Sequence, residues 1–290
     1  MSYYLDGTEI EIIKEADLGK VKHALFDFDG TISLIRDGWQ NVMVPMMVEI
    51  LAKTQTDETK EELKAIVIEF VDRLTGKQTI YQMIQLCEEV EKRGGVPLEP
   101  LEYKQMYNER LLPTVNDRIA KLESGEVDKA ELLLHGSMDF LRKLRDREVK
   151  LYLASGTDVE FVKHEADILG ITPYFTGGVF GAVKEYKTYS KAMVIQKILA
   201  DYNLSGSQLL IVGDGFVEIE NAKAVGAVAV GVASVENNMF GMNANKRLRL
   251  INAGADIIIP DYSDQDRLLE YLFQDGDRVP GEEIRSLSRR

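Results

Sequence analysis

The sequence is poor in the residues that build disulfides, histidine metal sites and membrane spans. Its 290 residues include a single cysteine, Cys87, so no disulfide forms within the chain. Its three histidines show no metal-ligand spacing. The longest apolar run, residues 42–48, contains Pro45 and is far shorter than the ~20 residues of a transmembrane helix. Because the chain start also lacks the layout of a secretion signal, we expect a cytoplasmic protein with no membrane partner.

Positive charge is also scarce. The chain has 35 Lys and Arg against 48 Asp and Glu, a net charge of -13 at pH 7. This balance argues against nucleic acid as a partner. An anionic substrate would have to be held by a few placed lysines or arginines together with a metal. The hydrophobic content of 45% is ordinary for a globular protein and is enough to bury a core.

Two acids two positions apart follow the first apolar segment. Residues 21–26 have the length and apolar bias of a strand, and Asp27, Asp29 and Gly30 come directly after it. Such a pair at the carboxyl end of a parallel strand could bind Mg²⁺ through oxygen, and one acid could act as a nucleophile. The alternative is a D-x-D-G turn that closes a hairpin.

Strand and helix patterns alternate after residue 148, which predicts an α/β fold with a doubly wound parallel sheet. The expected strands are residues 149–154, 208–212, 227–232 and 256–259, and the expected helices are residues 158–169, 190–202 and 217–225. Ser155 and Asp214 follow two of these strands. Because parallel strands end at one edge, we expect both to lie near Asp27 and Asp29, as a catalytic site requires.

A long insertion separates the first strand from the second. Asp29 and Val149 are 120 positions apart, far more than a single crossover helix needs. No strand pattern occurs in the insertion, and helices are expected over residues 39–53, 57–74, 79–93 and 99–111, with a shorter one after Pro113. Ahead of the first strand, Asp6-Gly7 predicts a small hairpin.

These motifs resemble those of the haloacid dehalogenase superfamily, in its phosphatase branch, which includes phosphoglycolate phosphatases and β-phosphoglucomutases. The first motif is residues 27–31, the second is Ser155, and the fourth is residues 213–218. The third motif is a lysine, for which we favour Lys191 because of its distance from Asp214, with Lys184 and Lys187 as alternatives upstream.

The resemblance implies a Rossmann-like core and an inserted α-helical cap. The core comprises residues 1–35 and 135–275, the cap residues 36–134, and residues 276–290 form a polar C-terminal tail. Because a cap that closes over a site sets its specificity, Arg36, Trp39 and Lys77 are candidates for substrate contacts.

The resemblance also implies the catalytic roles. Asp27 would attack phosphorus, and Asp29 would protonate the leaving alcohol and then activate water. The ligands of Mg²⁺ would be Asp27, the backbone carbonyl of Asp29, Asp214 and Glu218, although the family usually has aspartate where this chain has Glu218. The phosphate would be bound by Thr31, Ser155, Gly156 and Lys191.

The expected function is therefore hydrolysis of a small phosphorylated metabolite, such as a phosphosugar, by a Mg²⁺-dependent phosphatase. One alternative is a phosphomutase that uses the same aspartate pair, and another is a binding or regulatory protein on this scaffold. A dehalogenase fits less well because Asp29, the acid that phosphate chemistry needs, is present.

Overall fold

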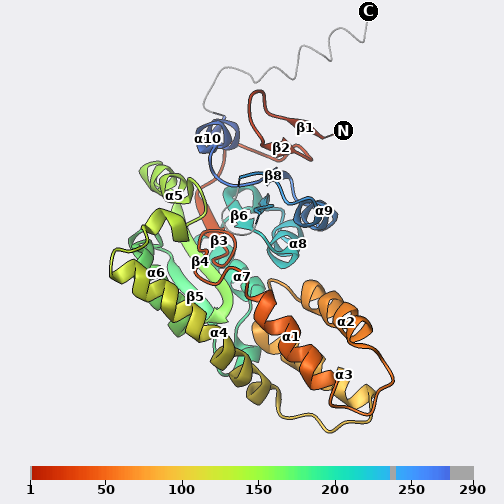
Figure 1. The fold of residues 1–290 in the computed structure, drawn as a ribbon. Coiled ribbons are helices and arrows are strands. Elements are labelled where there is room, and N and C mark those ends of the chain that lie inside the picture. The colour runs from red at the N-terminus through yellow and green to blue at the C-terminus, as the bar shows by residue number, and fades with distance from the viewer. Residues whose placement is uncertain (1, 236–239, 275–290) are drawn as a thin grey trace, which may run out of the picture.

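A mixed eight-stranded sheet forms the centre of the computed structural model, which describes residues 2–235 and 240–274 (Figure 1). The strand order is β1-β2-β8-β7-β6-β3-β4-β5. Strands β3 to β8 are parallel, whereas β1 and β2 form the expected antiparallel hairpin, which pairs with β8. In chain order the strands are β1 (Tyr3–Tyr4), β2 (Glu11–Ile12), β3 (His23–Phe26), β4 (Lys150–Asp158), β5 (Gly178–Ala182), β6 (Leu209–Gly213), β7 (Val228–Val232) and β8 (Ile257–Ile259).

Helices cover both faces of this sheet, which confirms the doubly wound fold. Successive residues of β3 point to opposite faces: Phe26 packs in the buried cluster that contains α5, α6 and α10, and Leu25 in the cluster that contains α7, α8 and α9. The core helices are α5 (Ser137–Asp146), α6 (Val159–Leu169), α7 (Lys191–Tyr202), α8 (Phe216–Ala224), α9 (Ala244–Asn252) and α10 (Gln265–Phe273).

Some core elements were absent from the sequence-based prediction. Strand β5 contains two glycines, Gly178 and Gly181, and three of its five residues are only partly buried, so it lacks the apolar run of a central strand. Helices α5, α9 and α10 were also not predicted. In α9 only Leu250 is buried, which leaves almost no apolar stripe to read.

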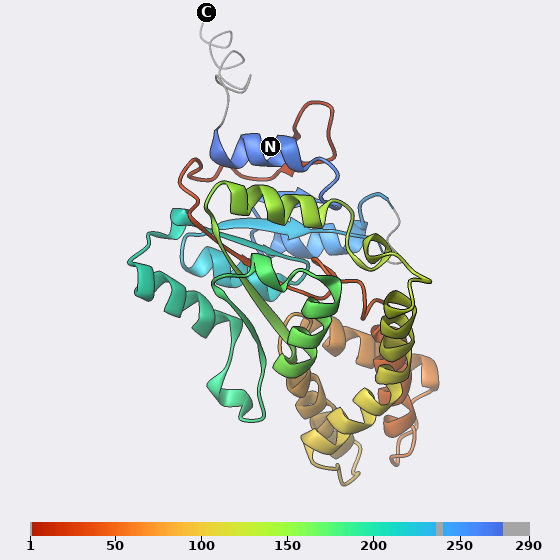
Figure 2. The ribbon, with the colours of Figure 1, turned by 90° about the vertical axis from the view of Figure 1, so that its left-hand side faces the viewer.

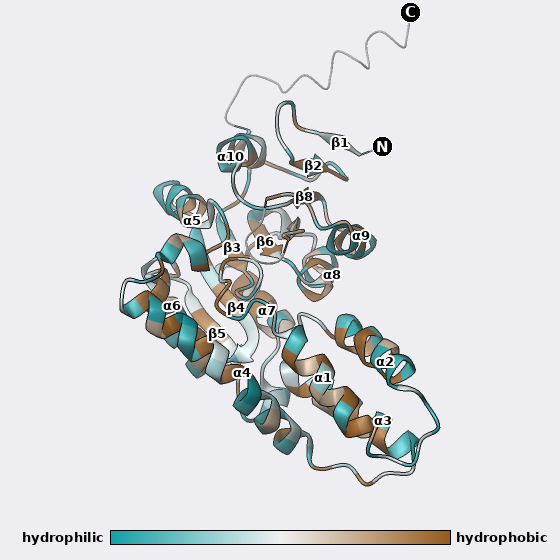
Figure 3. Ribbon diagram, viewed as in Figure 1, coloured by the Kyte–Doolittle hydropathy of each residue, from teal (hydrophilic) through white to brown (hydrophobic). Residues whose placement is uncertain are grey.

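Five α-helices lie between β3 and β4, and both views place the first four of them beyond one end of the sheet (Figure 2). These four are α1 (Gln40–Leu51), α2 (Lys60–Arg73), α3 (Thr79–Lys92) and α4 (Pro100–Glu123). We call residues 36–134 the helical insertion. In Figure 3, hydrophobic and hydrophilic residues alternate along α2 and α6, as expected for helices with one buried side.

The expected helix break at Pro113 was wrong. Helix α4 runs through Pro113 as one element of 24 residues. Buried side chains on both sides of the proline, among them Leu111 and Val115, belong to the same hydrophobic cluster. Tertiary packing therefore outweighs the hydrogen bond that proline removes.

The insertion leaves and rejoins the core at one place. The Leu34 N–H donates to the Leu132 carbonyl and the Leu134 N–H to the Ile32 carbonyl, each at 2.9 Å. The predicted boundaries at residues 36 and 134 fall beside this pair of segments.

The predicted tail, residues 276–290, lies outside the described residues. Across the described ranges, no helix has both the length and the apolar character to cross a bilayer.

Candidate active site

The first two acids leave β3 through a tight turn that brings them against the loop after β6. Gly30 has φ +75°, a conformation that favours glycine. A Cβ atom added there would lie 2.5 Å from Oδ2 of Asp214. The Asp214 N–H also donates to Oγ1 of Thr31 at 3.0 Å. The fully buried Thr31 therefore fixes the loop that carries Asp214.

Lys191 lies between two acids from different elements. It is the first residue of α7, whose N-cap Ser190 accepts a hydrogen bond from the Met193 N–H. Its Nζ donates to Oδ1 of Asp27 at 2.7 Å and also to Glu218.

The two other candidate lysines are exposed. Lys184 and Lys187 lie in the segment before α7 with their surfaces open to solvent. Of the three candidates for the third motif, the structure therefore brings Lys191 to Asp27.

Burial and neighbouring charge perturb this group of side chains. Burial raises the pKa of the Asp27 carboxyl well above its ordinary value, and the acids Glu218 and Asp214 raise it further, although Lys191 opposes them. Burial alone would lower the pKa of the Lys191 ammonium, but the carboxylates of Asp27 and Glu218 raise it overall. The ammonium is therefore held in its charged form.

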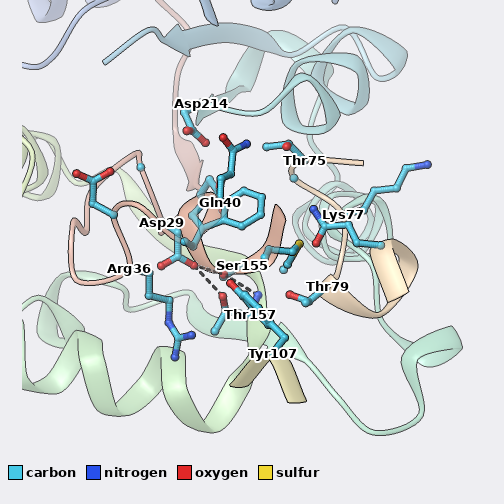
Figure 4. Close-up of a pocket in the computed structure, with 18 of the residues that line it drawn as sticks. Asp29, Arg36, Gln40, Thr75, Lys77, Thr79, Tyr107, Ser155, Thr157 and Asp214 are labelled. Carbon is cyan, nitrogen blue, oxygen red and sulfur yellow. Dashed lines mark hydrogen bonds between the residues drawn. The ribbon is translucent and has the colours of Figure 1, made fainter. Parts of the chain in front are cut away.

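Asp29 is held by two hydroxyl groups at the end of β4. Ser155 Oγ and Thr157 Oγ1 both donate to Oδ2 of Asp29, at 3.1 and 2.9 Å (Figure 4). Its Oδ1 is buried and has no hydrogen-bond partner. The sequence-based prediction missed Thr157, although alternate residues of a strand share a face, so Ser155 was a usable signal for it.

The arrangement fits a divalent cation. When all are ionised, the acids Asp27, Asp29, Asp214 and Glu218 face two lysines, Lys191 and Lys246, which leaves an excess of two negative charges. Oxygen donors of this kind suit Mg²⁺.

Glu218 bonds Lys191 through one oxygen, while its other oxygen is buried without a partner and it does not line the cleft described below. Within the described residues no three His, Cys, Asp or Glu side chains form a metal-binding group. The donors that remain are the carboxylates of Asp27 and Asp214 and the Asp29 main-chain carbonyl.

A cleft between the core and the helical insertion contains these groups. Asp27, Asp29 and Lys191 line it from the core, and Trp39 and Tyr107 from the insertion. Burial raises the pKa of the Tyr107 hydroxyl above its ordinary value, so this residue stays neutral. Nothing in the local sequence around Tyr107 indicated its place in the cleft.

The turn between α2 and α3 packs on the catalytic loops through its main chain. A Cβ atom at Gly156 would lie 2.5 Å from the Lys77 carbonyl oxygen, and one at Gly76 would lie 3.1 Å from a Glu218 oxygen. Gln78 donates to the carbonyls of Tyr186 and Tyr189. The Lys77 side chain is exposed and points away from Asp29 and Ser155 (Figure 4).

Arg36 is fully engaged with a neighbour in the core. Its guanidinium donates to both carboxylate oxygens of Glu165, with the shortest contact at 2.6 Å, and it lies over the ring of Phe161. Burial raises the pKa of Glu165 to about 7 against the opposing effect of Arg36. Trp39, at the start of α1, lines the cleft and packs against the hydrophobic core.

The fold and the acids at its strand ends define a hydrolase of the haloacid dehalogenase type. The family model described as haloacid dehalogenase-like hydrolase matches residues 21–226, and the chain belongs to this family. The search of curated proteins gave no match.

Similar solved structures share the fold. A β-phosphoglucomutase from Clostridium difficile is 14% identical, with a TM-score of 0.58, and the match covers 88% of this chain and 98% of that one. A predicted phosphoglycolate phosphatase from Haemophilus somnus 129PT is 14% identical with a TM-score of 0.56, covering 86% and 98%. A predicted phosphatase from Clostridium acetobutylicum is 17% identical with a TM-score of 0.56, covering 86% and 99%.

Proposed function

We propose that this protein is a Mg²⁺-dependent phosphatase that hydrolyses a small phosphorylated metabolite, with phosphosugars as the first candidates, through an aspartyl phosphate on Asp27. The observation that carries the proposal is the buried contact between Asp27 and Lys191 beside Asp29, whose Oδ1 has no partner. A nucleophile, a fixed cation and a carboxyl oxygen free to exchange a proton are the groups that stepwise phosphoryl transfer needs.

In the first step, the Asp27 carboxylate attacks phosphorus, a P–O bond to Asp27 forms, and the bond to the leaving alcohol breaks. Asp29 gives the departing oxygen a proton from Oδ1, while Ser155 and Thr157 hold its other oxygen. In the second step, Asp29 takes a proton from water, the water oxygen bonds to phosphorus, and Asp27 is released.

Lys191 compensates charge throughout both steps. Its ammonium contacts Asp27 directly and lies where negative charge builds between the nucleophile and the phosphoryl oxygens. Asp27, Asp214 and the Asp29 carbonyl would hold Mg²⁺, which neutralises phosphoryl charge and orients the phosphate when it is bound.

Ser155 and Thr31 take supporting roles in this proposal. Their hydroxyl groups bond Asp29 and the Asp214 loop respectively. Ser155, Gly156 and Lys191 all line the cleft, and in this proposal Gly156 and Lys191 bind the phosphate directly. The helical insertion acts as the cap, and its turn over Gly156 limits the entry of water.

The test is release of inorganic phosphate from a panel of sugar, polyol, nucleotide and amino-acid phosphates, with and without Mg²⁺. We expect turnover that requires Mg²⁺ and vanishes in Asp27→Asn. Interconversion of phosphosugar isomers without phosphate release would instead support a phosphomutase. Binding of these compounds with neither reaction would support a regulatory protein and contradict the proposal.

A further inference from the structure

Arg249 differs from the other cations that line the cleft. Of the five others, Arg36, Lys104, Lys191 and Lys246 contact a carboxylate at 3.0 Å or less, and Lys77 is exposed to solvent. The closest ion-pair contact of Arg249 joins Nη1 to Oδ1 of Asp72 at 3.9 Å. Its Nε is buried and has no hydrogen-bond partner.

The position of Arg249 places it beside the catalytic groups and opposite the insertion. It lies on α9, one helical turn after Lys246, so both side chains project from one face of that helix. Lys246 donates to Oδ2 of Asp214 at 3.0 Å, and Arg249 approaches Asp72 of α2. Arg249 therefore lines the cleft one helical turn from Lys246, the partner of Asp214, and approaches the insertion at Asp72.

Asp72 is an incomplete partner for this guanidinium. Its Oδ1 already accepts a hydrogen bond from Gln40 at 3.1 Å, and its side chain is 45% exposed. A buried N–H without an acceptor is destabilising. Two oxygens of a carboxylate or a phosphate could accept from Nε and an adjacent Nη together, which is the bidentate geometry that arginine favours.

We propose that Arg249 binds a second anionic group, a carboxylate or a second phosphate, at the end of the substrate remote from the transferred phosphate. This inference rests on the proposed phosphatase function. It assigns the substrate class as phosphate esters that carry another negative charge. On binding, the anion replaces Asp72 as the acceptor for Arg249.

The test uses three esters with the same three-carbon chain: n-propyl phosphate, 3-phosphooxypropanoate and propane-1,3-diol bisphosphate. We expect the wild type to prefer the two esters that carry a second anionic group, 3-phosphooxypropanoate and the bisphosphate (the charged esters). In Arg249→Gln the KM of the charged esters should rise by about 10- to 100-fold, with kcat and the kinetics of propyl phosphate unchanged. The two charged esters distinguish a carboxylate from a phosphate site. Arg142→Gln, an exposed arginine of α5 paired with Asp139, is the control and should behave as wild type.

A binding measurement separates this inference from the proposed function. Calorimetric titration with 3-phosphonopropanoate and propylphosphonate, which cannot be hydrolysed, should show tighter binding of the first. That difference should disappear in Arg249→Gln and grow in Asp72→Asn, which removes the competing carboxylate. If the wild type bound the phosphonates in this pattern but hydrolysed none of the esters, the proposed phosphatase function would be wrong and the Arg249 subsite would stand. Equal binding of the two phosphonates to the wild type, or a preference that survives in Arg249→Gln, would overturn the subsite.

Discussion

At their carboxyl ends, β3 and β4 direct Asp27, Asp29 and Ser155 toward the cleft, whereas near their amino ends the same strands carry His23 and Lys150. The polar groups near the amino ends are paired with one another. His23 Nδ1 lies 3.0 Å from the Tyr152 hydroxyl, and Lys150 Nζ donates to the Tyr202 hydroxyl at 2.5 Å and lies over that ring.

The carboxyl ends have more acids than cations and leave two buried carboxylate oxygens, on Asp29 and Glu218, without partners. Buried polar groups that remain unpaired cost stability. Buried ionisable groups occur at both ends, but of the two ends only the carboxyl ends leave an unpartnered buried oxygen, Oδ1 of Asp29, on a residue that lines the cleft. Substitutions there should change activity, and those near the amino ends should change stability.

The largest expected effect is that of Asp27→Asn. Loss of the nucleophile should reduce turnover by about 10⁴-fold or more. Glu218 still contacts Lys191 in this variant, so the buried cation keeps one partner. Phosphate release measures the loss of turnover. Turnover within tenfold of wild type would remove Asp27 from the mechanism.

Lys191→Met should affect both activity and stability. The substitution leaves Asp27 and Glu218 buried without their shared cation, which should cost about 3–5 kcal/mol in the free energy of unfolding. Turnover should fall by about 10²- to 10³-fold. Lys187→Met, at an exposed position, should change stability by less than about 0.5 kcal/mol and retain activity. The reverse pattern would assign the third motif to Lys187.

Gly76→Ala tests the contact between the helical insertion and the catalytic loops at the carboxyl ends of the strands. Gly76 has φ +87°, and a Cβ atom there would lie within 3.2 Å of both Glu218 oxygens. We expect a loss of about 1–3 kcal/mol in stability from backbone strain, with a fall in kcat/KM because the turn shifts off the catalytic loops. Gly125→Ala is the matched control, since Gly125 has φ +75° but no atom within 4 Å of an added Cβ. Equal kcat/KM values for the two variants would show that the Gly76 contact has no role in catalysis.

The smallest expected effect is that of His23→Phe, at the amino end of β3, on the pH dependence of stability. Burial, together with Lys150 and Lys22, lowers the pKa of His23 in the folded protein. As the pH falls, the unfolded chain therefore takes up the proton before the folded protein does. The contribution of neutral His23 to the free energy of unfolding is present above the unfolded pKa of about 6.5 and is lost as the pH falls toward the folded pKa. His23→Phe should show a weaker loss of stability between pH 7 and pH 5 in urea unfolding, with unchanged kcat at pH 7.5. A fall in kcat would contradict a purely structural role for this end.

The sequence was informative where a chemical group lies at or near the carboxyl end of a strand, although β4 runs to Asp158 and so contains Ser155, beyond its expected end at residue 154. Asp27, Asp29, Ser155 and Asp214 could be placed at one sheet edge because parallel strands share their direction. Lys191 was found through its place at the start of a helix and its distance from Asp214.

Groups that reach the cleft through tertiary packing could not be predicted. Tyr107 comes from a helix whose course through Pro113 is decided by its neighbours. Lys246 and Arg249 lie on α9, which has one buried residue and therefore almost no hydrophobic pattern. Arg36 was predicted to contact substrate, but the sequence gives no sign of its partner Glu165, which is 129 positions away.

The most direct test of the account is to trap the phosphorylated protein. Asp29→Asn removes the group that activates water, so a phosphate ester with a good leaving group, such as p-nitrophenyl phosphate, should phosphorylate the protein faster than water releases it. Borohydride reduction and peptide mass spectrometry should then place the modification on Asp27. Steady turnover by the wild type with no phosphorylation of Asp27, or with phosphorylation at another residue, would contradict the proposed mechanism.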